Sequence, residues 1–181
     1  MSELRTNKIV PRDGLPLSAS GGGIIQVVSV TKTDAESLAS TSTPQLIPGM
    51  QATITPQSAS NKILVMISLC ASVGGNYAAH YAVLRRDSTD IAVGDAAGSR
   101  NRATFSLQSP SFYFDNTFGP GFAAVNHLDS PATTSAVTYG LYHAEADNDG
   151  NALYINRSQG DTDSISYNRV TSSITLMEIS G

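Results

Sequence analysis

Tryptophan is absent from this chain, cysteine occurs once, and charged residues make up only 14% of the sequence. The single cysteine, Cys70, excludes a disulfide framework within the chain and favours synthesis in a reducing compartment. The longest apolar run, residues 63–67, has only about a quarter of the length needed to span a bilayer. Residues 1–10 also lack the apolar core of a signal peptide. We therefore expect a soluble protein made in the cytoplasm, with no membrane insertion.

An excess of positive charge is also missing. Lysine and arginine together number 11 against 15 aspartates and glutamates, which gives a net charge of −4 and an isoelectric point of about 5.2. Nucleic-acid-binding proteins usually show a basic footprint, and anionic membrane surfaces attract clusters of basic residues. Since the basic residues of this chain form no cluster, we expect neither partner.

The chain also lacks helical periodicity and shows short β-strand patterns instead. Serine and threonine make up roughly a fifth of the chain, and threonine favours strands. The segment 35–40 predicts at most a weak helical turn. No connection contains a crossover helix, so the pattern predicts an all-β antiparallel sandwich or jelly roll. The predicted strands cover residues 24–30, 50–55, 62–71, 79–86, 90–93, 102–107, 121–128, 136–144, 152–156 and 170–179.

The strand predicted over residues 62–71 is apolar on both faces. Leu64, Met66 and Cys70 occupy one face. A strand of this kind is normally covered on both sides, so its second cover must come from a loop, the N-terminal segment or another subunit. We expect it to contact other subunits. The candidate inter-subunit residues are those of its other face, Ile63, Val65, Ile67 and Leu69.

Residues 1–23 differ from the rest and predict an extended arm that precedes a sandwich domain of residues 24–181. Pro11, Pro16 and a run of three glycines, 21–23, argue against an independently folded unit. The arm is either a disordered tail or a segment that becomes ordered against a partner. Its candidate partner-binding residues are the apolar ones, Leu4, Ile9, Val10, Leu15 and Leu17.

Residues able to carry chemistry are scattered. His80, His127 and His143 lie in or beside predicted strands and none is at ligand spacing from another, whereas zinc sites need three or four converging ligands. We expect them to be ordinary strand residues and Cys70 to be a small core residue. Acidic residues of two turns, 147–149 and 161–163, leave calcium binding open, although the full loop pattern is missing. No catalytic residue, cofactor or metal site is predicted.

Two turn regions are candidates for exposed contacts. The segment 147–150 ends in an Asp-Gly pair that predicts a tight hairpin, and it supplies Asn148 and Asp149. The segment 112–122 is rich in aromatic rings and supplies Phe112 and Tyr113. These rings either contact a receptor or glycan or close one end of the sandwich.

Several segments, spread over nearly the whole chain, together carry a family resemblance. They are Leu4–Pro11 (LRTNKIVP), Gly14–Pro16, Gly21–Val28 (GGGIIQVV), Gly94–Arg100 (GDAAGSR), Leu128–Ser135 (LDSPATTS) with Thr138–Tyr139, Tyr154–Ser158 (YINRS) with Asp161–Asp163, and Ser173–Ile179 (SITLMEI). Together they resemble the tail-fibre-like virion proteins of marine and cyanobacterial bacteriophages. The resemblance implies a homotrimer of jelly-roll domains of the TNF/C1q type, found in the virion, with the arm docked on other virion proteins. It implies no catalytic residues.

The sequence therefore predicts a bacteriophage virion structural protein, a fibre-like component that projects from the particle and contacts a host-surface receptor or glycan. A capsid decoration or cement protein that stabilises the head shell is the alternative. An enzyme that cleaves glycans is disfavoured, because such sites usually pair two carboxylates across a groove. Here the acidic residues lie mostly at turns.

Overall fold

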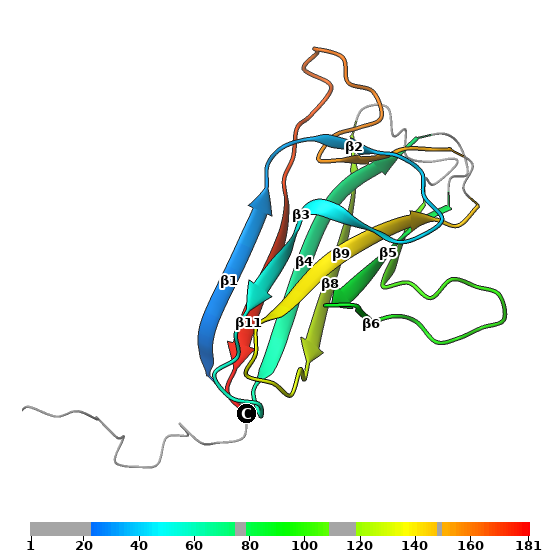
Figure 1. The fold of residues 1–181 in the computed structure, drawn as a ribbon. Helices are drawn as coiled ribbons and strands as arrows, with labels where there is room; N and C mark the ends of the chain where they lie inside the picture. The colour runs from blue at the N-terminus through cyan, green and yellow to red at the C-terminus, as the bar shows by residue number, and fades with distance from the viewer. Residues whose placement is uncertain (1–22, 75–78, 109–118, 148–149) are drawn as a thin grey trace, which may run out of the picture.

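A computed structural model of the protein describes residues 23–74, 79–108, 119–147 and 150–181 (Figure 1). Within these ranges the chain forms eleven β-strands and no helix, which confirms the predicted all-β class. The strands are β1 (Ile24–Lys32), β2 (Glu36–Leu38), β3 (Gln45–Ile54), β4 (Lys62–Val73), β5 (Ala79–Arg86), β6 (Thr89–Ile91), β7 (Phe105–Gln108), β8 (Gly121–Asp129), β9 (Val137–Glu145), β10 (Leu153–Ile155) and β11 (Ser172–Ile179).

The strands pair antiparallel in two sheets that pack face to face (Figure 1). The first sheet has the order β1-β11-β4-β8, and the short strands β10 and β2 extend it beside the end of β4. The second sheet has the order β3-β9-β5-β7, with β6 paired to the far end of β5. Because β3 and β4, β4 and β5, β7 and β8, and β8 and β9 each lie in different sheets, this is the strand order of a jelly roll.

Alternating apolar residues fill the space between the sheets. On β4 the residues of odd number, from Ile63 to Leu69, point inward and are between 0% and 2% exposed. They pack with the inward residues of β3, β9 and β11 in one core. The prediction that Ile63, Val65, Ile67 and Leu69 form an inter-subunit surface is therefore wrong. These side chains are already covered within one chain by the second sheet, so no neighbouring copy can reach them.

The weak helical turn considered possible at residues 35–40 does not form. Residues 36–38 form the short strand β2, in which Ser37 pairs with Tyr154 of β10. Serine-rich segments have weak helix propensity, and an available strand edge decides their conformation. Lys32, the last residue of β1, fixes the start of this segment, because its ammonium group bonds to Asp34 at 2.6 Å and to Glu36 at 3.1 Å.

The tight hairpin expected at residues 147–150 does not join two paired strands. The strand before it, β9, lies in the second sheet between β3 and β5, whereas β10 after it lies in the first sheet between β4 and β2. The connection therefore crosses from one sheet to the other. The Asp-Gly signal marks a change of direction and contains no information on which sheet receives the next strand.

The two ends of the sandwich are formed by different parts of the chain. The amide of Ser180 donates to the carbonyl of Gly23 at 3.1 Å, so the start of β1 and the end of β11 lie side by side. The connection between β10 and β11, residues 156–171, lies at the opposite end (Figure 1). With 12 residues, β4 spans about 40 Å between them.

A buried polar link ties the sheets together near the ends of β5, β8 and β9. Arg86 donates to both carboxylate oxygens of Asp129, at 3.0 and 2.9 Å, and the Tyr139 hydroxyl donates to the same carboxylate at 2.7 Å. Burial, followed by the hydrogen bond to Asp129, raises the pKa of Tyr139 above its ordinary value. Each of the three groups thus has a charged or polar partner, and Arg86 remains partly exposed at the edge of the link.

Removing the tyrosine hydroxyl from this link should lower the free energy of unfolding by about 1.5–3 kcal/mol, the usual value for a hydrogen bond to a charged group. Tyr139→Phe preserves the ring in the core and leaves Asp129 paired with Arg86. Urea denaturation of the two proteins measures the difference. An unchanged midpoint would contradict a stabilising role for this hydroxyl.

Candidate assembly surface

The outward side of the first sheet carries a cross-strand row of apolar side chains. Val27 of β1 is the partner of Met177 of β11, which is the partner of Leu64 of β4, which is the partner of Leu128 of β8. Paired residues project from the same side of a sheet, so these four side chains form one row. We call this side of the β1-β11-β4-β8 sheet the outer face.

Apolar residues continue along the outer face on both sides of that row. Met66 follows Leu64 on β4, and Phe122 is the partner of Cys70 near the end of the sheet. Ile24 is the partner of Ile179 near the opposite end. Val27 is 55% exposed, Leu128 is 50% exposed and Phe122 is 69% exposed. All the large exposed apolar residues of the described chain except Ile165 lie on β1, β4 or β8.

Charge is scarce on the outer face. Among the described positions that point outward from these four strands, only Lys62 is charged. The remaining polar positions are small, and the hydroxyls of Ser29 and Thr175 bond to each other at 2.8 Å. The outward positions are Ile24, Val27, Ser29, Thr31, Lys62, Leu64, Met66, Ser68, Cys70, Phe122, Ala124, Asn126, Leu128, Ser173, Thr175, Met177 and Ile179.

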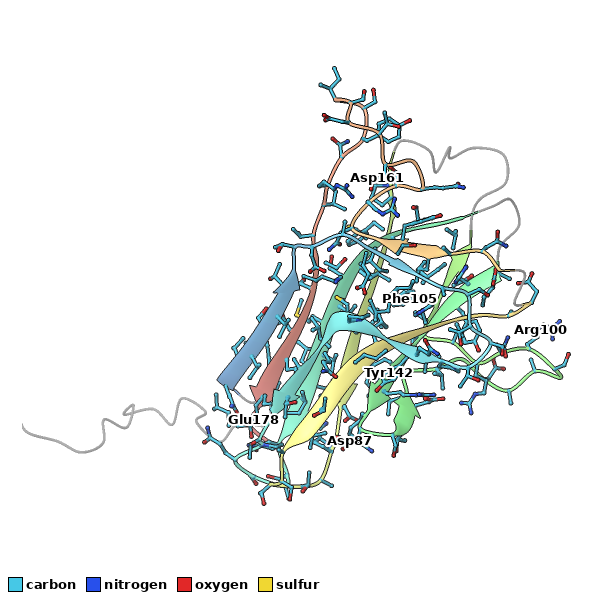
Figure 2. The ribbon with its side chains drawn as sticks, turned by 45° about the horizontal axis from the view of Figure 1, so that its top comes forward. Asp87, Arg100, Phe105, Tyr142, Asp161 and Glu178 are labelled. Atoms are coloured by element: carbon cyan, nitrogen blue, oxygen red, sulfur yellow. The ribbon has the colours of Figure 1, made fainter. Side chains whose placement is uncertain are left out.

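The outward side of the second sheet has a different character. The guanidinium carbon of Arg85 lies 4.5 Å from the centre of the Tyr142 ring, and the Arg85 side chain bonds to Asp90 at 2.6 Å. The hydroxyls of Thr53 and Thr138 bond to each other at 2.8 Å. Tyr142 is labelled in Figure 2. Polar side chains on this side therefore pair with one another, and the contrast identifies the outer face as the unusual surface.

The outer face approaches the size of a standard protein interface. Four strands at about 4.8 Å spacing and eight residues at about 3.3 Å each give a flat footprint of roughly 20 by 26 Å, or about 520 Å². This is about two thirds of the roughly 800 Å² of accessible surface that each partner contributes to a standard interface. Cys70 lies on this face and is half-buried, which corrects the prediction of a core position. Burial raises the pKa of its thiol.

The structure brings two of the three histidines together, which the sequence did not predict. The ring centres of His80 and His143 lie 6.3 Å apart on the inner side of the second sheet, and His80 is the cross-strand partner of Glu145. His127 lies on β8 of the other sheet. The one sequence feature that could have indicated this arrangement is the spacing of His143 and Glu145. They are two residues apart in a strand, which puts them on the same face.

The remaining predicted contact residues lie outside the described residues. This applies to the arm residues Leu4, Ile9, Val10, Leu15 and Leu17, and to the loop residues Asn148, Asp149, Phe112 and Tyr113. The described loop that extends furthest at the end of the sandwich away from the C-terminus is the connection 156–171 (Figure 1). Figure 2 places Asp161 of this connection at one end of the molecule and Glu178 of β11 toward the other.

Asn156 holds the base of this connection inside the sandwich. Its side-chain amide donates to the carbonyls of Lys32 and Asp34, at 2.9 and 3.0 Å, and its side-chain oxygen accepts from Ser172 at 2.6 Å. The residue is fully buried and has a left-handed φ of 59°. Its side chain thus ties the β1–β2 turn to the start of β11, and the connection leaves a fixed base.

The outer part of this connection is polar and concave. Asp161 bonds to Arg169 and lies 3.6 Å from Arg157, and the Arg157 guanidinium stacks on the Tyr154 ring at 4.3 Å. A depression of about 250 Å³ is lined by residues 157–169 of this connection. In the described part of the chain, no group of three or more His, Cys, Asp or Glu is placed to hold a metal ion.

No protein-family model matches the chain, and no curated protein matches it significantly. In the described residues no helix is long and apolar enough to cross a membrane.

Proposed function

We propose that the protein is a structural protein of a bacteriophage virion. In this proposal it assembles as a homotrimer through the outer face, is fixed to other virion proteins by residues 1–23, and presents the opposite end of the sandwich to the host surface. The location in the virion and the number of three subunits are inferred from the resemblance of the sequence to tail-fibre-like virion proteins. The outer face supplies the physical reason for assembly.

The observation that supports assembly most strongly is the apolar, nearly uncharged row across four strands. Burying apolar surface contributes about 25 cal/mol per Å², so a chain that leaves such a face in water forgoes much stabilisation. Interface centres are depleted of charge in the same way as this face. The polar contacts on the outward side of the second sheet, such as that of Arg85 with Asp90, suit a surface that stays in water.

The positions of the two ends support attachment at one end and display at the other. The arm leaves the sandwich at Gly23, beside the end of β11, and the connection 156–171 lies at the far end. A subunit anchored through its arm therefore holds Asp161 and its neighbours away from the anchor. The polar depression there presents carboxylate, hydroxyl and guanidinium groups, which suit a hydroxyl-rich ligand such as a surface glycan.

Substitutions in the connection 156–171 should make the purified protein a weaker competitor of phage adsorption to the host, while leaving assembly intact. The purified double variant Thr162→Ala with Asp163→Ala should block phage adsorption about tenfold less effectively than the unchanged protein, the usual loss for one or two important contacts. Thr134→Ala with Ser135→Ala, in the connection between β8 and β9 at the anchored end, is the matched control and should block adsorption normally. Equal blocking by both double variants would contradict the attachment role.

The position of the protein on the particle separates fibre from capsid decoration. Antibodies raised against residues 24–181 should label the tail or projecting fibres of purified particles in immunogold electron microscopy. Labelling spread evenly over the head would favour the decoration function instead. Particles without any label would contradict both.

A further inference from the structure

The strands β1, blue in Figure 1, and β8 form the two long edges of the first sheet. Within the described residues β1 pairs only with β11 and β8 pairs only with β4, so each has one side without a partner strand. Each has nine residues and no proline, and the only Lys, Arg, Asp or Glu of each is its last residue, Lys32 or Asp129. These two side chains are buried and form ion pairs within the chain, so they do not guard the edges.

The edges of the second sheet are of the kind that natural proteins protect. The edge strand β3 contains Pro48 and has a register irregularity between Leu46 and Gln51. On the other side β7 has four residues and β6 has three. Natural proteins shorten or interrupt edge strands because an unpaired row of N–H and C=O groups pairs readily with other chains. The long, regular edges of the first sheet therefore suit pairing with another chain.

We propose that the two edges pair with each other between copies of the chain, with β1 of one copy hydrogen-bonded to β8 of the next around a threefold axis. This inference rests on the proposed assembly through the outer face and specifies how the subunits join. The partner of each edge is a second copy of this chain, because the two edges match in length, lack of charge and direction.

Strand direction permits this pairing. β1 is antiparallel to β11, β11 to β4, and β4 to β8, so β1 and β8 run in opposite directions. Rotation about an axis parallel to the strands leaves the direction of every strand unchanged. The β8 strand of the next copy is therefore antiparallel to β1, and the alternation continues from copy to copy. Contacts between two different edges are head-to-tail, and such contacts generate closed rings.

The rows of the outer face meet at this junction. The apolar row ends at Val27 on β1 and at Leu128 on β8, so level pairing places Val27 beside Leu128 of the next copy. The row then becomes a closed apolar ring, in which neither end faces water. At the next level Ser29 lies beside Asn126 of the next copy. Both levels belong to the part of β1 that pairs regularly, from Gln26 onward.

Three copies fill the space around the axis. Four strands at about 4.8 Å spacing make each side of a triangle about 19 Å long, and the axis then lies about 5.5 Å from each sheet. Side chains need about 5 Å, which is half of the roughly 10 Å between packed sheets. Four copies would place the axis about 10 Å from each sheet and leave a central gap. Three subunits therefore bury the outer face, and the joined edges add contact area to its flat footprint.

Engineered disulfides test the junction. Ser29→Cys with Asn126→Cys, in a chain where Cys70→Ser removes the natural thiol, should form covalent dimers and trimers on oxidation, and nothing larger. Opposed residues of antiparallel strands lie about 4.5–5.5 Å apart, which a disulfide bridges. Within one copy the two positions are three strand spacings apart, about 14 Å, which is too far. Each single cysteine should therefore give only single chains on a non-reducing denaturing gel.

The matched control places cysteines on the edges of the second sheet. Gln51→Cys with Ser106→Cys occupies exposed positions of β3 and β7 and should stay uncross-linked. A reduced Ser29→Cys with Asn126→Cys protein that sediments as a trimer but gives no cross-link would overturn the edge pairing and leave assembly through the outer face standing. Cross-linked products of four or more copies would overturn the threefold ring. Unsubstituted protein that sediments as a single chain would overturn the proposed assembly and the pairing together.

Hydrogen exchange of the unsubstituted, assembled protein needs no engineered cysteine. Alternate amides of β1 and β8 point away from β11 and β4, and these should exchange at least about tenfold more slowly than in the dissociated variant Val27→Glu with Leu128→Glu. Amides of β9, in the middle of the second sheet, should exchange alike in both proteins. Equal exchange of the β1 and β8 amides in a trimer and in the dissociated variant would contradict hydrogen bonding between the edges.

Discussion

Asn156→Ala should lower the free energy of unfolding by about 4 kcal/mol. The substitution removes three hydrogen bonds of about 1 kcal/mol each and leaves the carbonyls of Lys32 and Asp34 and the hydroxyl of Ser172 without this partner. It also places a residue with a Cβ, but without the local hydrogen bonding of asparagine, at a left-handed φ of 59°, which costs about 1 kcal/mol more. Urea denaturation at neutral pH measures the loss.

Two controls separate the causes of this loss. Asn156→Gly removes the same side-chain bonds but tolerates the left-handed backbone, so it should retain about 1 kcal/mol relative to Asn156→Ala. Asn168→Ala lies on the exposed part of the same connection and should change the free energy of unfolding by no more than about 0.5 kcal/mol. A loss from Asn156→Ala as small as that from Asn168→Ala would show that the buried amide does not hold this connection.

Two carboxylates placed on the outer face should separate the assembled subunits. Val27→Glu with Leu128→Glu replaces two half-exposed apolar side chains at opposite ends of the cross-strand row. Burying these charges against a neighbouring copy is unfavourable, so the dissociation constant should rise by on the order of 100-fold or more. Both positions already face water in the single chain, so its free energy of unfolding should change by less than about 1 kcal/mol.

The matched control adds the same charge to the other sheet. Gln51→Glu with Thr53→Glu lies at exposed positions of β3, on the polar side of the sandwich. This variant should assemble as the unsubstituted protein does. Sedimentation equilibrium measures both variants, and equal weakening by the two pairs would indicate a general effect of charge in place of an interface on the outer face.

The strands themselves were readable from the sequence because their signals are local. Residues 79–86 were predicted with the bounds that β5 has, and the alternation in residues 62–71 located β4 within two residues of its end. The short strand β2 was missed, since Glu36–Leu38 has no pattern of its own and depends on the edge of β10. Pairing between distant strands has no local signal, so the crossing between sheets after Glu145 was missed as well.

The two faces of β4 show why the candidate assembly surface could not be located from the sequence alone. Both faces are apolar, and the sequence suggested that one of them contacts other subunits, but nothing in the alternation shows which face meets the second sheet. The larger and more regular set, Ile63 to Leu69, packs inside the chain, and Leu64 and Met66 face outward. The approach of His80 to Glu145 was unpredictable for the same reason, because it depends on the register of β5 and β9.

Sedimentation equilibrium of the intact, unsubstituted protein over a range of concentrations tests the central claim most directly. If the outer face is an assembly surface, the protein should sediment with three times the chain mass of 18.9 kDa and dissociate only on dilution. A single species of 18.9 kDa at every concentration would mean that this apolar face stays in water, which would contradict the account.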